Sequence, residues 1–474
     1  MFFERIYEKG LAQASYVIGC QATKEAIVID PKRDIDSYLQ ITERENLKIT
    51  HIAETHIHAD FLSGSLELAN ATAAKIYLSD EGGNDWQYQF DHIGLKDGDV
   101  IKIGNLVIKV LHTPGHTPEH ISFMLIDEPA SPEPIMIFTG DFVFVGDVGR
   151  PDLLEKAAGI EGTMIEGAKQ MFQSLKKFKA LPDHIQVWPA HGAGSACGKS
   201  LGAVPSSTVG YEKLSNWALN IEDEETFIQS LLDGQPEPPK YFAMMKKLNK
   251  VGPKILGSLQ HPAKLNASEF NSALNTGYQI VDTRDKLSFA GGHIWGSINI
   301  QDNNSFSTWA GWMLDYEKPI ILITSEHGVD ILNRALLRIG FDKLQGYISD
   351  LDKLEAIGQK MEILNQISAD ELTEDFSSFR ILDVRSYTEF NLVHIPTAVN
   401  IHAGYFEKYL NIISPDERIV VYCTSGDRSA IAASYLLRNG YKNVFNLSGG
   451  INSWIQSGLK IERTITEELT SINS

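Results

Sequence analysis

A repeat in the carboxyl-terminal half constrains the fold of this chain more than any other feature. Three pairs of short segments match at a spacing of 101 residues: 280–284 with 381–385, 293–294 with 394–395, and 298–300 with 399–401. This period is too long for a solenoid repeat, and it indicates duplication of a whole small domain. We therefore predict two tandem α/β domains, at residues 256–360 and 366–474.

The second copy carries a cysteine in a reactive setting. Residues 419–422 (IVVY) form a predicted buried strand, Cys423 follows directly, and a helix is predicted from residue 430. Loop amides and the start of a helix favour a thiolate, and so does Arg428 nearby. Cys423 is therefore predicted to be a nucleophile, the alternative being a buried structural cysteine.

This second copy resembles the rhodanese family of sulfurtransferases. The resemblance rests on Asp383-x-Arg385, Glu389, His394-Ile395-Pro396 and Cys423-x4-Arg428. It implies that Cys423 carries sulfane sulfur as a persulfide, with Arg428 as a second catalytic residue. The rival is a phosphatase with a Cys-x5-Arg loop, which is one residue longer than the loop of this chain.

The first copy has Thr324 where the second has Cys423, and the arginine is missing as well. A threonine is chemically unsuited to carrying sulfur. We expect residues 256–360 to be a rhodanese-like domain without catalytic activity, with a loop about one residue shorter.

The amino-terminal part reads as a separate domain of strands and helices, at residues 1–250. A segment rich in proline and glycine at residues 233–239 marks its end. Alternating or apolar runs predict strands and one amphipathic run predicts a helix, which together suggest sheets covered by helices. The predicted strands are 16–20, 26–31, 75–78, 106–111, 121–125 and 135–138, and the helix is 163–178.

Histidines and aspartates follow several of these strands, as in a metal site. They are His56, His58, Asp60, His116, Asp141 and His191. His56, His58 and His116 could hold zinc, or His56, His116 and Asp141 could hold Fe(II) as two histidines and one carboxylate. The spacing does not choose between these sets.

Two further residues are candidates near this site. Arg150 could pair with a substrate anion or form a surface salt bridge. Cys197 lies in a loop of small residues and could relay sulfur, or it could be an ordinary loop cysteine.

Residues 1–250 resemble the metallo-β-lactamase superfamily, which implies an αββα sandwich. The dinuclear hydrolases of that superfamily have Asp-His where this chain has Asp60-Phe61. A phenyl ring cannot bind a metal, so we expect one ion per chain. Fusion to rhodanese modules resembles the persulfide dioxygenases of bacterial sulfide detoxification, which implies Fe(II) at His56, His116 and Asp141. His58, Asp60 and His191 would then orient the ligands.

The resemblance implies an oxidoreductase of sulfur metabolism. A low-molecular-weight thiol persulfide and dioxygen would give sulfite and thiol, and Cys423 would transfer sulfur to sulfite to give thiosulfate. The alternatives are a zinc-dependent thioester hydrolase of the glyoxalase II type fused to a sulfurtransferase, and a non-enzymatic persulfide sensor or carrier.

The charge and the cysteine content bear on partners and compartment. The net charge of −19 and the absence of a long basic run argue against nucleic acid and anionic membrane surfaces as partners. Three scattered cysteines argue against a disulfide framework and favour the cytoplasm. No apolar run is long enough to span a membrane, and a homo-oligomer is compatible with the sequence.

Overall fold

A computed structural model describes residues 1–153, 155, 162–199, 201–356 and 358–464. The chain divides into two compact units, one of Met1–Gln260 with Arg334–Gly340 and one of His261–Asn333 with Phe341–Ser474. The end of the predicted domain 366–474 lies outside the described residues from 465 onward. No helix among the described residues is long and apolar enough to cross a membrane.

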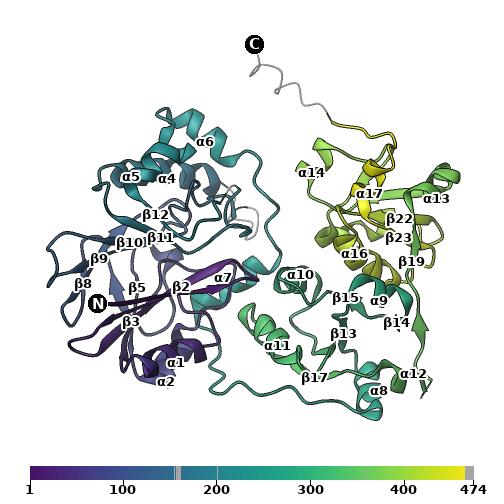
Figure 1. Cartoon of the computed structure of the whole chain (residues 1–474), viewed down its shortest axis with the longest axis horizontal. Coiled ribbons are helices and arrows are strands. Elements are labelled where there is room, and N and C mark those ends of the chain that lie inside the picture. Colours follow the sequence, from purple (N-terminus) through teal and green to yellow (C-terminus); the bar gives the residue numbers. More distant parts are fainter. Residues whose placement is uncertain (154, 156–161, 200, 357, 465–474) are drawn as a thin grey trace. The chain divides into compact units, whose positions relative to one another are not determined.

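The first unit contains two six-stranded sheets (Figure 1). The strands of the first sheet, in spatial order, are β1 Phe2–Glu8, β2 Gln13–Cys20, β3 Glu25–Ile29, β4 Lys48–Ala53, β5 Lys75–Ser79 and β6 Ile93–Leu95. Those of the second are β12 Ser207–Thr208, β11 Gln186–Pro189, β10 Met136–Gly140, β9 Ile121–Asp127, β8 Leu106–His112 and β7 Val100–Ile103. Each sheet mixes parallel and antiparallel neighbours.

The alternation of side chains along the strands explains the layers. Ala14, Tyr16 and Ile18 of β2 point into a core between the two sheets, whereas Val17 packs into a second core with Tyr38 of helix α1, Asp36–Arg44. A third core lies under helix α4, Thr163–Lys179, on the far face of the second sheet. Helices thus cover both outer faces, and the predicted αββα sandwich is confirmed.

The helices of the first unit lie on opposite sides of the strands, with α1 and α2 on one side and α4 to α6 on the other (Figure 1). They are α1 Asp36–Arg44, α2 Ser65–Thr72, α4 Thr163–Lys179, α5 Val209–Ser215, α6 Glu224–Leu232 and α7 Tyr241–Val251, with short 3-10 turns at Asn84–Trp86 and Trp217–Asn220. The predicted helix 163–178 corresponds to α4, whose buried residues form one face.

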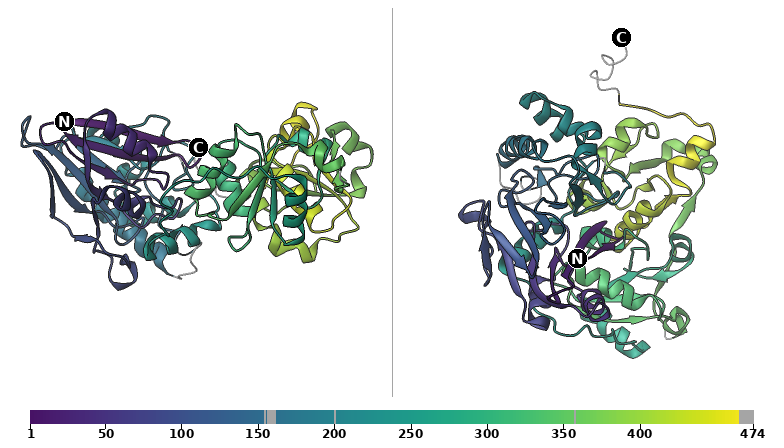
Figure 2. Two further views of the ribbon diagram at one scale, coloured as in Figure 1. Left: turned by 90° about the horizontal axis from the view of Figure 1, so that it is seen from below. Right: turned by 60° about the vertical axis from the view of Figure 1, so that its left-hand side comes forward.

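The second unit holds two parallel sheets, one for each copy of the repeat. The strands of the first copy are β15 Ile298–Asn299, β13 Gln279–Asp282, β16 Ile320–Ile323 and β17 Leu344–Ile348, and β14 His293–Ile294 pairs with β18 Met361–Glu362. Those of the second copy are β19 Asn365–Ile367, β23 Val444–Leu447, β22 Arg418–Tyr422, β20 Phe379–Asp383 and β21 Val399–Asn400. Figure 2 shows the chain passing from the purple and blue strands of the first unit to these green and yellow elements.

Helices connect the parallel strands in both copies. In the first copy they are α8 Ala267–Asn275, α9 Lys286–Gly291, α10 Phe306–Met313, α11 Val329–Arg338 and α12 Leu351–Ala356. In the second they are α13 Ala369–Glu374, α14 Tyr387–Leu392, α15 Phe406–Tyr409, α16 Asp427–Arg438 and α17 Gly450–Gln456, with 3-10 turns at Phe376–Ser378, Ala403–Tyr405 and Leu410–Ile412.

The residues that repeat at a spacing of 101 have structural roles. Arg284 forms a bidentate ion pair with Asp282, and Arg385 forms the same pair with Asp383. Each arginine thereby neutralises a buried carboxylate at the end of a central strand, β13 in the first copy and β20 in the second. The repeated residues therefore stabilise the fold that both copies share. Catalytic residues have to be sought among the positions that differ between the copies.

Helix α7 holds the loop of residues 54–64, which contains His56, His58 and Asp60, through hydrogen bonds of one side chain. The buried side chain of Asn249 donates to the carbonyls of His58 and Phe61, at 2.8 Å each, and accepts from the Ser63 amide at 2.9 Å. This loop has no regular secondary structure of its own, so these three bonds satisfy backbone groups that no helix or strand satisfies.

Replacing Asn249 with alanine should therefore loosen the loop. Three buried hydrogen bonds would be lost, and we expect the free energy of unfolding to fall by about 3 kcal/mol. Urea denaturation followed by tryptophan fluorescence measures the change. Asn220→Ala removes a single bond from an exposed asparagine and serves as the control. Equal midpoints for the two variants would contradict this role of Asn249.

Candidate metal centre and cysteine site

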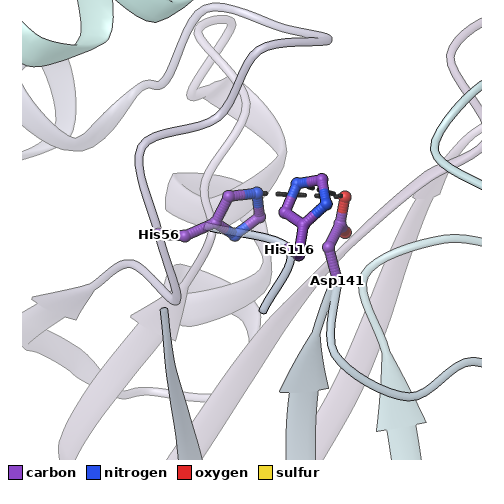
Figure 3. Close-up of side chains that lie close together, drawn as sticks. All are labelled: His56, His116 and Asp141. Carbon is purple, nitrogen blue, oxygen red and sulfur yellow. Dashed lines mark ion pairs between the residues drawn. The ribbon is translucent and has the colours of Figure 1, made fainter. Parts of the chain in front are cut away.

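Strand ends deliver the metal-site residues to one edge of the sandwich. His56 follows β4, His116 follows β8, Asp141 follows β10 and His191 follows β11. Figure 3 shows the side chains of His56 and His116 converging on that of Asp141. The sequence order of strands and polar residues thus predicted their proximity correctly.

His56, His116 and Asp141 form a buried cluster that fits a metal ion. Asp141 Oδ2 lies 3.4 Å from His116 Nε2 and 3.8 Å from His56 Nε2. Within the described part of the chain, neither carboxylate oxygen of Asp141 nor Nε2 of His56 has a hydrogen-bond partner. Buried polar atoms without partners are costly, and a cation bound between them would remove that cost.

The second ring nitrogen of each histidine is already engaged. His116 Nδ1 donates to the Arg150 carbonyl at 2.9 Å, and His56 Nδ1 lies 3.0 Å from the Thr55 hydroxyl. These contacts orient the rings with Nε2 toward Asp141, as outer partners of metal-binding histidines do.

The protonation states suit a metal as well. Burial and the neighbouring histidines hold the pKa of His56 well below its usual value, and burial lowers the pKa of His116. Burial disfavours the carboxylate of Asp141, but the imidazoles of His191 and His116 hold its pKa below the usual value. Two neutral imidazoles and one carboxylate are the forms that bind metal.

His58 lies beside His56, with their ring centroids 4.2 Å apart. Its Nε2 lies 3.2 Å from Asp30 Oδ1, and Asp30 also accepts from the amide and hydroxyl of Thr55. Burial disfavours the charged ring, yet the carboxylates of Asp30, Glu54 and Asp60 raise the pKa of His58 to about 9. Among the described residues, the atoms that lie close enough together to share one ion are those of His56, His116 and Asp141, whereas His58 pairs with Asp30.

Asp30 was missed by the sequence reasoning. It is fully buried, has a φ of 51°, and supports the motif loop from the end of β3. In the sequence, this aspartate stands between a strand and Pro31. Aspartate before proline is common in ordinary turns, so the pattern did not mark Asp30 as part of the site.

A second group of ligand-type atoms lies beside the first. Asp60, His191 and Cys197 come together, and His191 Nε2 is 3.3 Å from both Asp60 Oδ2 and Asp141 Oδ1. Burial and the carboxylates of Asp141 and Asp60 raise the pKa of Cys197 well above that of a free thiol. Cys197 is thus close to the metal cluster, as expected, but its thiol is held protonated, which disfavours a role as sulfur nucleophile.

Phe61 fills the position next to Asp60 with an apolar ring. Its ring centroid lies 4.4 Å from that of His58, and the side chain is buried. The ring therefore packs against the motif instead of offering a ligand.

Of the two alternatives for Arg150, a surface salt bridge does not apply, because the residue is fully buried and its ion pair lies in the interior. It forms two bonds with Asp152, of 2.7 and 2.6 Å, and its Nη1 donates to the Ala196 carbonyl at 3.2 Å. Because its own carbonyl holds His116, Arg150 links the metal cluster to the loop of Cys197.

Only glycine fits at position 140, directly before Asp141, because there is no room for a side chain. Gly140 has a φ of 51°, and a Cβ there would lie 2.5 Å from the Thr55 hydroxyl and 2.6 Å from His120 Nε2. His120 accepts from the Asp141 amide and contacts Thr113 through Nδ1, so its ring holds the backbone of the motif in place.

Cys423 lies at the end of β22 inside a short loop before α16. Its Sγ accepts from the Gly426 amide at 3.1 Å and lies 3.6 Å from the Ser429 hydroxyl. Amide donors of this kind stabilise a thiolate or persulfide anion.

Arg428 interacts with Cys423 and also with Glu389. Its guanidinium forms a bidentate pair with Glu389, at 2.7 and 2.8 Å, and donates to the Thr424 hydroxyl at 2.7 Å. The ion pair with Arg428 outweighs burial and lowers the pKa of Glu389 to about 2. Arg428 thus braces the loop that surrounds Cys423.

The first copy has a different loop. Thr324 follows β16, and α11 begins at Val329, whereas α16 begins four residues after Cys423. The loop of the first copy is therefore one residue longer before its helix, and the expectation of a shorter loop was wrong.

Comparisons with known proteins agree with this architecture. The model of the metallo-beta-lactamase superfamily matches residues 9–191, and that of the rhodanese-like domain matches residues 266–353 and 368–457. A solved structure of a metallo-beta-lactamase from Staphylococcus aureus is 48% identical, covers 74% of this chain and 99% of its own, and superposes with a TM-score of 0.69.

Two other similar proteins match the first domain. The structure of ETHE1 from Myxococcus xanthus is 28% identical and covers 53% of this chain and 98% of its own, with a TM-score of 0.44. A hydroxyacylglutathione hydrolase from Rhodospirillum rubrum is 33% identical over 37% of this chain, which spans 60% of that enzyme's length. With the sandwich, the metal cluster and the tandem copies already described, the chain belongs to the metallo-β-lactamase superfamily, with a metallo-β-lactamase domain followed by two rhodanese-like domains.

Proposed function

We propose that this enzyme oxidises a low-molecular-weight thiol persulfide with dioxygen and passes sulfur to the resulting sulfite. The observation that carries the proposal is the pairing of a cluster of two histidines and one carboxylate with a cysteine held in an amide-lined loop. The first is the ligand set of non-haem Fe(II) oxygenases, and the second is suited to carrying sulfane sulfur.

The oxidation balances with one dioxygen per persulfide. RSSH, O2 and H2O give RSH, sulfite and two protons, and the terminal sulfur loses the four electrons that dioxygen gains. Bound Fe(II) at His56, His116 and Asp141 would supply the redox chemistry. The chain's own residues orient the imidazoles through Thr55 and the Arg150 carbonyl, and the ring of Phe61 packs against His58 beside the cluster.

The sulfur transfer takes place at Cys423. Its thiolate attacks the terminal sulfur of a second RSSH, so that a Cys423 persulfide forms and RSH leaves. Sulfite then attacks the outer sulfur, giving thiosulfate and the free cysteine. The Gly426 amide stabilises the anionic sulfur in both steps. Fusion raises the effective concentration of sulfite at its acceptor.

A zinc-dependent thioester hydrolase is the second candidate. The proximity of Asp60 and His191 to Asp141, and the likeness to hydroxyacylglutathione hydrolases, favour it. Thioester hydrolysis, however, gives no role to Cys423.

Removal of a cluster residue tests the first reaction. His116→Ala should abolish stoichiometric iron and slow oxygen uptake with glutathione persulfide at least about 100-fold, because one of three ligands is lost. Metal analysis of anaerobically purified protein and an oxygen electrode measure both effects. The exposed His184, changed to alanine, is the matched control. Equal uptake in the two variants, or wild-type protein without iron, would refute the dioxygenase.

A second variant separates the two reactions. Cys423→Ser should oxidise the persulfide at the wild-type rate but accumulate sulfite in place of thiosulfate, because the sulfur carrier is missing. Chromatography of the sulfur oxyanions after labelling quantifies both products. Thiosulfate formation at the wild-type rate would rule out Cys423 as the carrier.

A further inference from the structure

We propose that the silent rhodanese-like copy completes the sulfur site of the active copy through Lys286. This inference rests on the proposed role of Cys423 and assigns Lys286 as a positioning residue that acts on Cys423 through one peptide group. It also gives the copy without a cysteine a function.

The contact is made on the catalytic loop itself. Lys286 Nζ donates to the Ser425 carbonyl at 2.8 Å and to Asp427 Oδ1 at 2.8 Å. The amide of the same peptide group, Gly426 N–H, donates to Cys423 Sγ at 3.1 Å. The peptide group between Ser425 and Gly426 is thus bound at both ends. Its carbonyl accepts from the Lys286 ammonium, and its N–H donates to the sulfur of Cys423.

The physical effect follows from the geometry of the peptide. Its C=O and N–H point in opposite directions in the trans form, and the two dipoles are coupled by resonance. A positive charge on the carbonyl polarises the peptide and makes its N–H a stronger donor, as in hydrogen-bonded chains. The stronger donor favours the thiolate and the persulfide anion over their protonated forms.

Lys286 is held firmly enough to do this. It begins α9, whose N-cap Asp285 accepts from the amides of Leu287 and Ser288. Phe289 and Ala290 of the same helix pack into a hydrophobic core that also contains Cys423. The position 101 residues later is Tyr387, so the lysine is not part of the repeated scaffold.

The other ionisable groups around the loop are accounted for. Arg428 pairs with Glu389 and also interacts directly with Cys423, in the wild type and in every lysine variant alike, and Asp427 accepts from the Ser425 hydroxyl as well as from Lys286. Burial and the charge of Arg428 lower the pKa of His402 to about 4, so this ring is neutral at neutral pH. Lys286 is therefore the cation bound to the peptide that contacts the sulfur.

The test measures the alkylation rate of Cys423 by iodoacetamide in the full-length protein, read by mass spectrometry of the Cys423 peptide. In Lys286→Met the rate should fall about fivefold at neutral pH, the size of typical dipole effects. It should equal the wild-type rate at about pH 10, where thiols are ionised regardless of the lysine. Lys286→Arg keeps a donor to the carbonyl and should react like the wild type.

The control is Lys264→Met, which removes an exposed lysine of the same copy that pairs with Glu326. Its alkylation should be unchanged. Wild-type rates in Lys286→Met at neutral pH would overturn the inference, and so would an equal loss at both pH values, which indicates distortion of the loop. An arginine variant as slow as the methionine variant would also overturn it.

A separate measurement distinguishes failure of the Lys286 inference from failure of the proposed sulfur transfer. Wild-type Cys423 should gain one sulfur atom when treated with glutathione persulfide. If it does, but Lys286→Met behaves as the wild type, the lysine inference alone is wrong. If wild-type Cys423 gains no sulfur, the proposed sulfur transfer is wrong and the inference falls with it.

Discussion

The metal site depends on one buried carboxylate to which none of the described residues donates a hydrogen bond. Asp141 has no solvent exposure, and its oxygens face Nε2 of His56, His116 and His191 at 3.3 to 3.8 Å. Burying such a group alone costs far more than a folded domain can spare. A bound cation removes the cost, so folding of this edge and metal binding stabilise each other.

Much of this arrangement could be predicted from the sequence because it obeys simple periodicities. Strands such as β2 are apolar runs that are buried along their whole length, α4 has one buried face, and His116 and Asp141 come soon after strands. Asp30 and the buried state of Arg150 could not be predicted in this way. Both depend on contacts between segments far apart in the chain, for which single positions carry no pattern.

The two rhodanese-like copies share residues that stabilise the fold and differ in the residues suited to catalysis. Both copies have the same ion pair at the end of the equivalent strand. It joins Arg284 to Asp282 in the first copy and Arg385 to Asp383 in the second. Cys423 occurs in one copy only, and the sequence therefore predicted one active and one silent domain. It gave no sign that Lys286 of the silent copy would reach the loop of the active one, because that contact exists only after both have folded and packed.

The central claim is that one iron is held by His56, His116 and Asp141. Anomalous diffraction at the iron absorption edge, on crystals of protein purified without oxygen, tests it most directly. The account predicts a single peak between the two Nε2 atoms and the Asp141 carboxylate, with none beside Asp60. A second peak held by Asp60 and His191, or a signal at the zinc edge only, would contradict it.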